Sequence, residues 1–249
     1  MDYYFLLTGI ILGSFFNVLI DRLPKGQNVL WGRSHCDHCK KTLRWFELIP
    51  VVSYISQGGK FRRCHSGLSM QYPVMEIITG LGYFLIFRSY SYDIVAFIGI
   101  LILFSAFLVI TVADVKYQII PDSMLVLSVI GICVLLYSNF ETSQLISHGL
   151  SAICSGGFFY ALWYFTKGRG MGFGDVKLAF ILGLFLGFPL IIVALYIAFL
   201  TGAFLGVILI IAGAKTMKSK IPFGPFLIVG AAAAFIFQQY FLKLWNLYF

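Results

Sequence analysis

The chain has 249 residues, of which 60% are hydrophobic and only 11% are charged, and its formal net charge is +8. A soluble fold cannot bury this share of apolar side chains, so the composition indicates an integral membrane protein whose partner is the lipid bilayer. The positive charge does not indicate nucleic-acid binding, because the Lys and Arg residues lie in short gaps between apolar runs. Five scattered cysteines exclude a disulfide scaffold.

Eight apolar runs are candidates for membrane spans, which need roughly 20 apolar residues, or fewer where a helix is broken or buried in a bundle. The fourth and sixth runs are short. The turn Gly187-Phe188-Pro189 is the weakest boundary, and one long kinked helix over the sixth and seventh runs is the alternative. We therefore predict an all-α membrane helix bundle of about eight spans: Tyr3–Ile20, Tyr72–Phe87, Ile94–Ala113, Ser123–Tyr137, Leu145–Phe165, Val176–Phe188, Leu190–Ala212 and Phe223–Leu242.

The first run is expected to be retained in the protein. Asp2 precedes it in place of a basic segment, and no small-x-small cleavage site follows it, so the pattern is not that of a removable signal peptide. The predicted organisation is a first span at 1–20, a loop domain at 21–71 and a transmembrane bundle at 72–249.

Basic residues predict the orientation. Sixteen of the 18 Lys and Arg residues fall on one side of the predicted topology, nine of them in the 21–71 loop, and only Arg88 and Lys243 fall on the other. Loops rich in Lys and Arg stay in the cytoplasm. We therefore expect a multi-pass protein of the cell membrane with both termini outside and the 21–71 loop in the cytoplasm.

Four of the ten acidic residues lie in or at the edges of apolar runs, namely Glu76, Asp114, Asp122 and Asp175. An ionised side chain costs at least about 2.5 kcal/mol near the bilayer centre, so such residues usually face a polar cavity or a partner. Asp114 ends the third run, Asp122 opens the fourth, and Asp175 opens the sixth after Gly172-Phe173-Gly174. The three aspartates therefore fall at one membrane face, which permits their convergence in one site.

A pair of converging aspartates suits hydrolysis. Two like charges a few ångström apart do not both ionise easily, so the pair shares a proton. The charged member then activates a water, and the protonated member polarises the carbonyl of the bond to be cut. The glycines before Asp175 would let an extended substrate backbone approach closely.

The residues alone leave two other interpretations open. Aspartates at helix ends are also common caps and turn residues, and Glu76 would complement the start of the second span. A proton- or cation-coupled transporter would use intramembrane carboxylates as well.

Ordered motifs along the chain resemble one family. Gly172-Phe173-Gly174-Asp175, followed by Val176-Lys177, resembles the GxGD signature of intramembrane aspartyl proteases, and Asp114 with Ile120-Pro121-Asp122 resembles the other aspartate motif of the type IV prepilin peptidases. Further segments match that family in order: Gly13–Val18 with Arg22-Leu23-Pro24, Cys36-Asp37-His38-Cys39, Tyr72–Glu76 and Ile221–Pro225. A lone GxGD is weak evidence, but ordered matches across essentially the whole chain are strong.

The resemblance implies a bifunctional membrane enzyme of a pilus, competence or secretion system. Such enzymes cut the short basic leader from prepilins or pseudopilins at the cytoplasmic side, without a cofactor, and many then N-methylate the new terminus with S-adenosylmethionine. Carried over by motif, Asp114 and Asp175 are the catalytic pair, and the supporting residues are Asp122, Gly172, Gly174, Lys177 and Glu76. Glu76 is expected to bind the new amino terminus. An inactive scaffold derived from such a peptidase is disfavoured, since it has no need of a carboxylate pair.

The cysteines depart from the family pattern of two CxxC pairs. Cys36 and Cys39 form the first pair and Cys64 keeps one position of the second, but Phe61 stands where the fourth cysteine would be. One interpretation is a structural zinc site on these three thiols, with a fourth ligand from a neighbouring histidine: His35, His38 or His65. The other is three reduced cytoplasmic thiols in a loop held together by apolar residues.

Overall fold

The computed structural model describes residues 2–29, 31–32, 34–36, 38–39, 41–62, 64–90, 92–138, 142–213 and 221–248. Asp37 lies outside these ranges, and so do six of the sixteen basic residues counted above: Arg33, Lys40, Arg63, Lys215, Lys218 and Lys220. The described residues form helices and two isolated antiparallel bridges, and none of them belongs to a strand. The predicted all-α class is confirmed.

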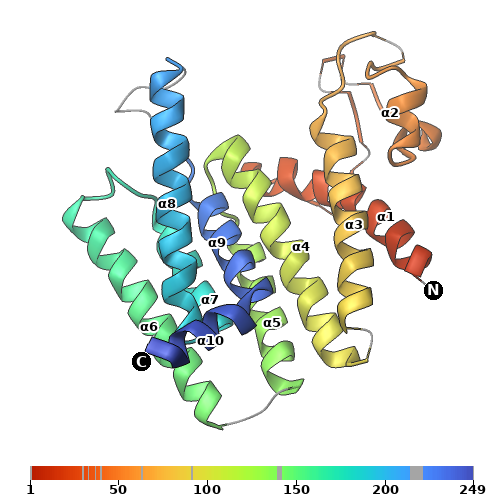
Figure 1. The fold of residues 1–249 in the computed structure, drawn as a ribbon. Coiled ribbons are helices and arrows are strands. Elements are labelled where there is room, and N and C mark those ends of the chain that lie inside the picture. The colour runs from red at the N-terminus through yellow and green to blue at the C-terminus, as the bar shows by residue number, and fades with distance from the viewer. Residues whose placement is uncertain are drawn as a thin grey trace. The chain divides into compact units, whose positions relative to one another are not determined.

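The chain divides into two units, Met1–Val109 and Ile110–Phe249, with the boundary inside helix α4. Unit 1 contains the paired helices α1 and α3, the start of α4, and between α1 and α3 a loop with three short helical turns (Figure 1). Its elements are α1 (Asp2–Arg22), η1 (Leu23–Lys25), η2 (Trp45–Leu48), α2 (Val52–Ser56), α3 (Gln71–Tyr90) and α4 (Ile94–Tyr117).

Unit 2 contains the end of α4 and six further helices, in which α6 packs on α7 and α8 packs on α9 (Figure 1). Their bounds are α5 (Asp122–Ser138), α6 (Thr142–Phe165), α7 (Phe173–Leu186), α8 (Leu190–Ile211), α9 (Gly224–Ile236) and α10 (Gln238–Tyr248). The break between α7 and α8 falls at the Gly187-Phe188-Pro189 turn, so these are two helices and not one kinked helix.

The first seven predicted spans each fall on one helix and the eighth covers α9 and the start of α10, but the number of membrane spans stays a prediction. Among the described residues, four helices are long and apolar enough to cross a membrane: Tyr3–Lys25, Ile94–Tyr117, Gln144–Phe165 and Leu190–Ile211. A fifth is counted if α9 and α10 form one bent span.

The eighth predicted span, Phe223–Leu242, contains two helices, and its crossing of the membrane as one span stays a prediction. The chain bends by 76° between α9 and α10. The sequence hides this bend because apolar residues stand on both sides of the break. Only Gln238 and Gln239, which begin α10, interrupt the apolar run. α9 is apolar throughout, whereas α10 has one polar face. A helix with one polar face is stable along the membrane surface, so α10 turns away from the direction of α9.

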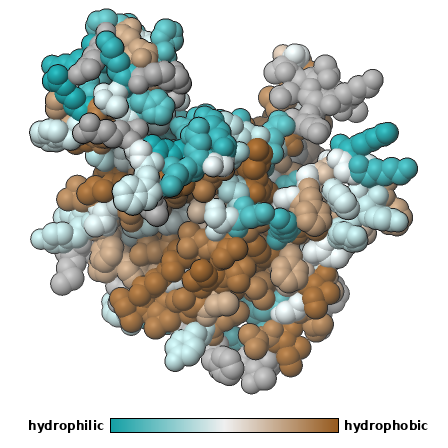
Figure 2. Space-filling view, turned by 180° about the vertical axis from the view of Figure 1, so that it is seen from behind, coloured by the Kyte–Doolittle hydropathy of each residue, from teal (hydrophilic) through white to brown (hydrophobic). Residues whose placement is uncertain are grey.

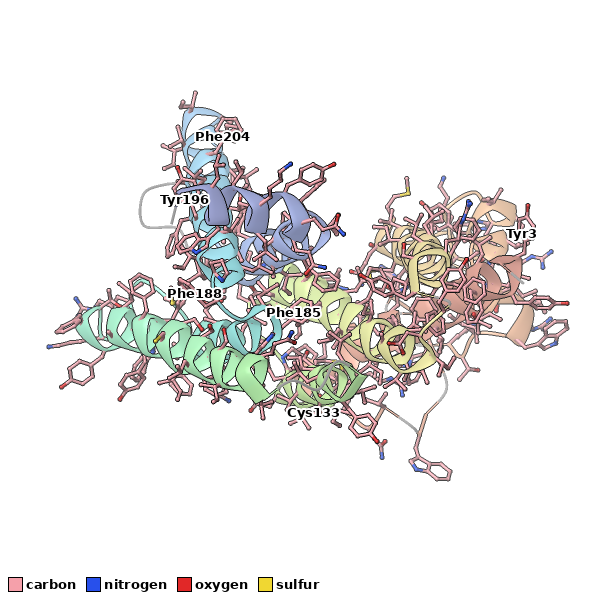
Figure 3. The ribbon with its side chains drawn as sticks, turned by 60° about the horizontal axis from the view of Figure 1, so that its bottom comes forward. Tyr3, Cys133, Phe185, Phe188, Tyr196 and Phe204 are labelled. Atoms are coloured by element: carbon pink, nitrogen blue, oxygen red, sulfur yellow. The ribbon has the colours of Figure 1, made fainter. Side chains whose placement is uncertain are left out.

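The surface is that of a membrane protein. Hydrophobic side chains cover a broad area of the face drawn in Figure 2. On α8, Tyr196 and Phe204 are 66% and 70% exposed, and both stand out from the helix in Figure 3. Large apolar side chains exposed in this number need lipid as their solvent.

Glycines set the distance between paired helices. A Cβ at Gly9 of α1 would lie 2.8 Å from the Cα of Gly80 in α3, and a Cβ at Gly13 would lie 2.8 Å from the Cα of Glu76. In unit 2, a Cβ at Gly230 of α9 would collide with a backbone oxygen of α8. Helices in membranes associate through such small residues because their backbones then approach closely.

We expect Gly9→Leu to destabilise unit 1 by about 2 kcal/mol, because the new side chain must push α3 away from α1. The matched control is Gly157→Leu in α6, where a Cβ would meet nothing within 4 Å. Thermal unfolding of the two variants in detergent checks this, and equal melting temperatures would contradict the close α1–α3 packing.

Candidate active site

Asp114 lies in the last turn of α4, with only 5% of its surface exposed. The backbone N–H of Gly224, the first residue of α9, donates a hydrogen bond of 3.0 Å to its Oδ2. A Cβ at position 224 would lie 2.7 Å from that same oxygen, so only glycine brings the N–H this close. The N-terminus of α9 therefore points its partial positive charge at the carboxylate.

Asp175 occupies the first turn of α7 and is 8% exposed. Its Oδ2 accepts a hydrogen bond of 3.2 Å from the backbone N–H of Gly172, the N-cap residue. The extended backbone of Gly172, with φ −74° and ψ 150°, directs this N–H back toward the carboxylate. Asp175 is thus held like Asp114, by a glycine N–H at the start of a helix.

The two carboxylates lie close enough to interact electrostatically. Ile120 packs against the glycine beside each of them, because a Cβ at Gly174 would lie 3.1 Å from its Cβ and a Cβ at Gly224 would lie 3.5 Å from its Cδ1. The turn after α4 brings Ile120 to this place. Gln118 has the left-handed φ of 54° that ends α4, and its N–H bonds the carbonyl of Asp114. Asp114 and Asp175 are thus brought near each other by one shared neighbour, Ile120, which packs against the glycine next to each carboxylate.

Asp122 lies apart from the buried pair. Its side chain is 73% exposed and forms an ion pair with Lys177, whose Nζ donates a 2.6 Å hydrogen bond to Asp122 Oδ1. The same Nζ lies 5.6 Å from the ring centroid of Phe173. This ion pair joins the first residue of α5 to the second turn of α7. An exposed pair contributes little stability, so its main effect is to fix the position of the two side chains.

Two residues of this site carried no role in the sequence prediction. Gly224 stood inside the quoted Ile221–Pro225 segment, and Ile120 stood inside Ile120-Pro121-Asp122, but neither pattern reveals which residue faces a carboxylate. The hydrogen bond of Gly224 spans 110 positions in the sequence. The structure also gives Gly174 a reason beyond substrate approach, since Ile120 occupies the space of its missing side chain.

Glu76 lies in unit 1, in the first turns of α3, and is 5% exposed. Its Oε2 accepts a 2.7 Å hydrogen bond from the N–H of Val51, and Ser14 lines the same cavity as Glu76. Val51 has φ of 60°, an unusual value for a β-branched residue. Glu76 lines a cavity of about 410 Å³ with other polar side chains, among them Asn17, Asp21, His35, Glu47 and Tyr72.

Cys36, Cys39 and Cys64 form a cluster in the loop, with ligand atoms within 4.8 Å of one another. Phe61 lines the same small cavity. Hydrogen bonds from Ser66 lower the pKa of Cys64 to about 7. Within the described part of the chain no histidine joins this cluster. The three sulfurs fit three corners of a tetrahedral zinc site, and Phe61 stands at the cluster without a ligand atom.

Two family models match the sequence. The Bacterial Peptidase A24 N-terminal domain matches residues 7–90, and the Type IV leader peptidase family matches residues 101–207. No solved structure is significantly similar to the chain.

Curated relatives extend these matches over nearly the whole chain. A prepilin leader peptidase/N-methyltransferase of Burkholderia pseudomallei is 31% identical, covering 96% of this chain and 86% of the relative. Proteins of the same name from Bacillus subtilis and from Pectobacterium carotovorum are 27% and 32% identical, covering 93% and 73% of this chain and 92% and 73% of each relative. These matches give the transporter hypothesis no support. The chain belongs to the type IV leader peptidase family.

Proposed function

We propose that the chain is an intramembrane aspartyl endopeptidase that removes the basic leader from type IV prepilins or pseudopilins. The observation that carries the proposal is the buried pair Asp114 and Asp175, each held by a glycine N–H at a helix N-terminus. The names of the relatives support the substrate class.

The chemistry assigned to the pair needs only water. The charged carboxylate takes a proton from a water molecule, whose oxygen attacks the carbonyl carbon of the bond to be cut, while the protonated carboxyl donates its proton to the carbonyl oxygen. The C–N bond then breaks: the leaving amine takes the proton that the first carboxyl gained from water, and the hydroxyl that becomes the product's carbonyl returns its proton to the second carboxylate. Both carboxyl groups are required, because neither acid nor base catalysis alone completes this sequence.

The basic residues support an orientation for this reaction. The asymmetry of sixteen against two favours both termini outside and the 21–71 loop in the cytoplasm. In this orientation Asp114 and Asp175 lie at the cytoplasmic edge of the membrane, where a basic leader would be found. Residues 1–20 would be the first span and 72–249 the bundle.

Asp114→Asn and Asp175→Asn are each expected to abolish cleavage of a prepilin while leaving folding and membrane insertion intact. The neutral amide keeps the shape and the hydrogen-bond acceptor but cannot exchange the proton. Asp122→Asn is the matched control, since Asp122 lies outside the buried pair and its loss should have a milder effect. The measurement is the mass of the product formed by each of the three variants. Loss of cleavage in Asp122→Asn with cleavage retained in Asp114→Asn would reverse the roles of these two residues.

We propose N-methylation of the new terminus as a second activity, located in unit 1. The relatives are named as N-methyltransferases, and the cavity around Glu76 is lined by three carboxylates, Asp21, Glu47 and Glu76, beside the basic residues Arg22 and Lys25. The methyl donor S-adenosylmethionine carries a sulfonium cation and a carboxylate, and the acceptor is an amine, so side chains of both charges have a use in this cavity, whose volume of about 410 Å³ is that of a small-molecule site. S-adenosylmethionine supplies the methyl group. Glu76 would bind the amino terminus through its carboxylate.

Glu76→Gln is expected to reduce methylation at least tenfold while leaving cleavage near the wild-type rate, because the amide keeps an acceptor for Val51 N–H but loses the charge that binds an amine. The control is Asp93→Asn, a carboxylate outside this cavity that also accepts backbone N–H groups. Product mass separates the two steps, and unchanged methylation in Glu76→Gln would remove Glu76 from the site.

Zinc, if it binds the Cys36, Cys39 and Cys64 cluster, is proposed to be structural. Chelation is then expected to leave cleavage largely intact and to affect loop folding or methylation only. Metal content should fall in Cys36→Ser and not in Cys133→Ser, since Cys133 lies on α5 (Figure 3). Metal analysis beside peptidase rates checks both points; stoichiometric zinc whose removal stops cleavage would refute the structural role.

A further inference from the structure

A pocket of about 280 Å³ lies in the 21–71 loop, and neither activity proposed above makes use of it. Lys60, Arg62 and His65 line it, and none of its described lining residues is acidic. The guanidinium carbon of Arg62 lies 5.8 Å from the ring centroid of Phe46, which also lines the pocket, so this contact holds the Arg62 side chain at the site. Arg and Lys side chains gathered in this way suit a phosphate group.

The helix α2, which adjoins this pocket, has an exposed apolar face. Ser56 ends α2 and lines the pocket. Val52 and Ile55, which are 59% and 71% exposed, stand three positions apart and therefore share one face of the helix. The turn η2, which packs on α2, adds Trp45 with 78% of its surface exposed. Apolar side chains of this size and exposure indicate an interaction surface.

Hydrogen bonds within unit 1 place α2 at the depth of the membrane surface. The N–H of Val51, directly before α2, is bonded to Glu76, and the Cα of Glu76 lies against Gly13 of α1. Gly13 lies about 18 Å, at 1.5 Å per residue, before the Lys25 end of the candidate membrane helix Tyr3–Lys25. Val51 is therefore held below that end, and α2 lies beside the start of α3 (Figure 1). Its exposed face can meet lipid without any change of fold.

We propose that α2 and the adjoining pocket dock the 21–71 loop on anionic lipid. Val52 and Ile55 enter the boundary between headgroups and acyl chains, and Lys60 and Arg62 bind the phosphate of a lipid headgroup. Exposed Trp, short apolar faces and flanking Lys and Arg are typical of segments that lie in this boundary. The inference goes beyond cleavage and methylation and depends on neither.

Charge favours anionic lipid over the other candidate occupants. The 21–71 loop carries nine Lys and Arg residues against three acidic ones, Asp21, Asp37 and Glu47. A second copy of this loop, or a basic peptide, would bring positive charge to positive charge. Free phosphate would suit the pocket but would leave the face of Val52 and Ile55 uncovered. An anionic bilayer surface complements both parts, because it offers phosphate and apolar chains side by side.

Photo-cross-linking of the full-length protein in vesicles tests the docking. The photoreactive amino acid p-benzoylphenylalanine replaces Ile55, whose exposed side chain can be exchanged without disturbing a core. The matched control carries it in place of Thr42, an exposed residue of the same loop outside α2 and the pocket. The vesicles hold equal parts of phosphatidylglycerol, which is anionic, and phosphatidylcholine, which has no net charge. We expect lipid adducts, identified by mass, at position 55 and few at position 42.

The same adducts test the pocket. Among them we expect phosphatidylglycerol to exceed phosphatidylcholine by a factor of at least about five, the equivalent of about 1 kcal/mol for one Lys or Arg near anionic lipid. Lys60→Gln/Arg62→Gln, combined with the probe at position 55, should bring this ratio to about one. Lys167→Gln/Arg169→Gln removes two exposed cations outside the loop and should leave the ratio unchanged, as should an excess of inorganic phosphate.

The absence of lipid adducts at position 55, or equal yields at positions 55 and 42, would overturn the docking of α2. A lipid ratio that Lys60→Gln/Arg62→Gln does not change would remove the pocket from the lipid site. Loss of the phosphatidylglycerol excess when inorganic phosphate is added would assign the pocket to a free anion and overturn its role in docking.

Discussion

The arrangement of unit 2 depends on two carboxylates, Asp114 and Asp175, buried in a bundle whose other buried residues are mostly apolar. Burying such a group without hydrogen bonds costs several kcal/mol, so its surroundings must supply donors. Gly224 and Gly172 supply backbone N–H groups to Asp114 and Asp175, and each N–H belongs to a helix start, where it has no partner within the helix. Among the described residues, every buried side-chain nitrogen or oxygen has a hydrogen-bond partner.

Glycine serves two purposes in this chain, and both come from the absence of a side chain. Between α1 and α3, and between α8 and α9, it lets backbones touch and so replaces the hydrophobic driving force that lipid cannot supply. Beside the aspartates, it lets an N–H reach a carboxylate oxygen and leaves room for Ile120. The same property thus holds the helices together and builds the site.

Much of this account could be predicted from the sequence, since composition and apolar runs are properties of short segments. Asp114, Asp122 and Asp175 were predicted to share one face because each stands at the end of an apolar run. The separation of Asp122 from the buried pair could not be predicted, because it depends on Lys177, 55 positions away. The bend after Ile236 could not be predicted either, because the local sequence is apolar on both sides of it. The zinc site remains a prediction, because Phe61 removes one ligand and the cluster has only three thiols.

The central claim is that this chain alone cuts a leader from its substrate with two carboxyl groups and no metal. The most direct test is the product mass after the purified wild-type protein, in lipid bilayers and with chelator present, has acted on a prepilin with a basic leader and an apolar helix. The account predicts a product lacking the leader, cut at one bond between leader and helix. An intact substrate beside a folded protein, or cleavage that stops when metal is removed, would contradict it.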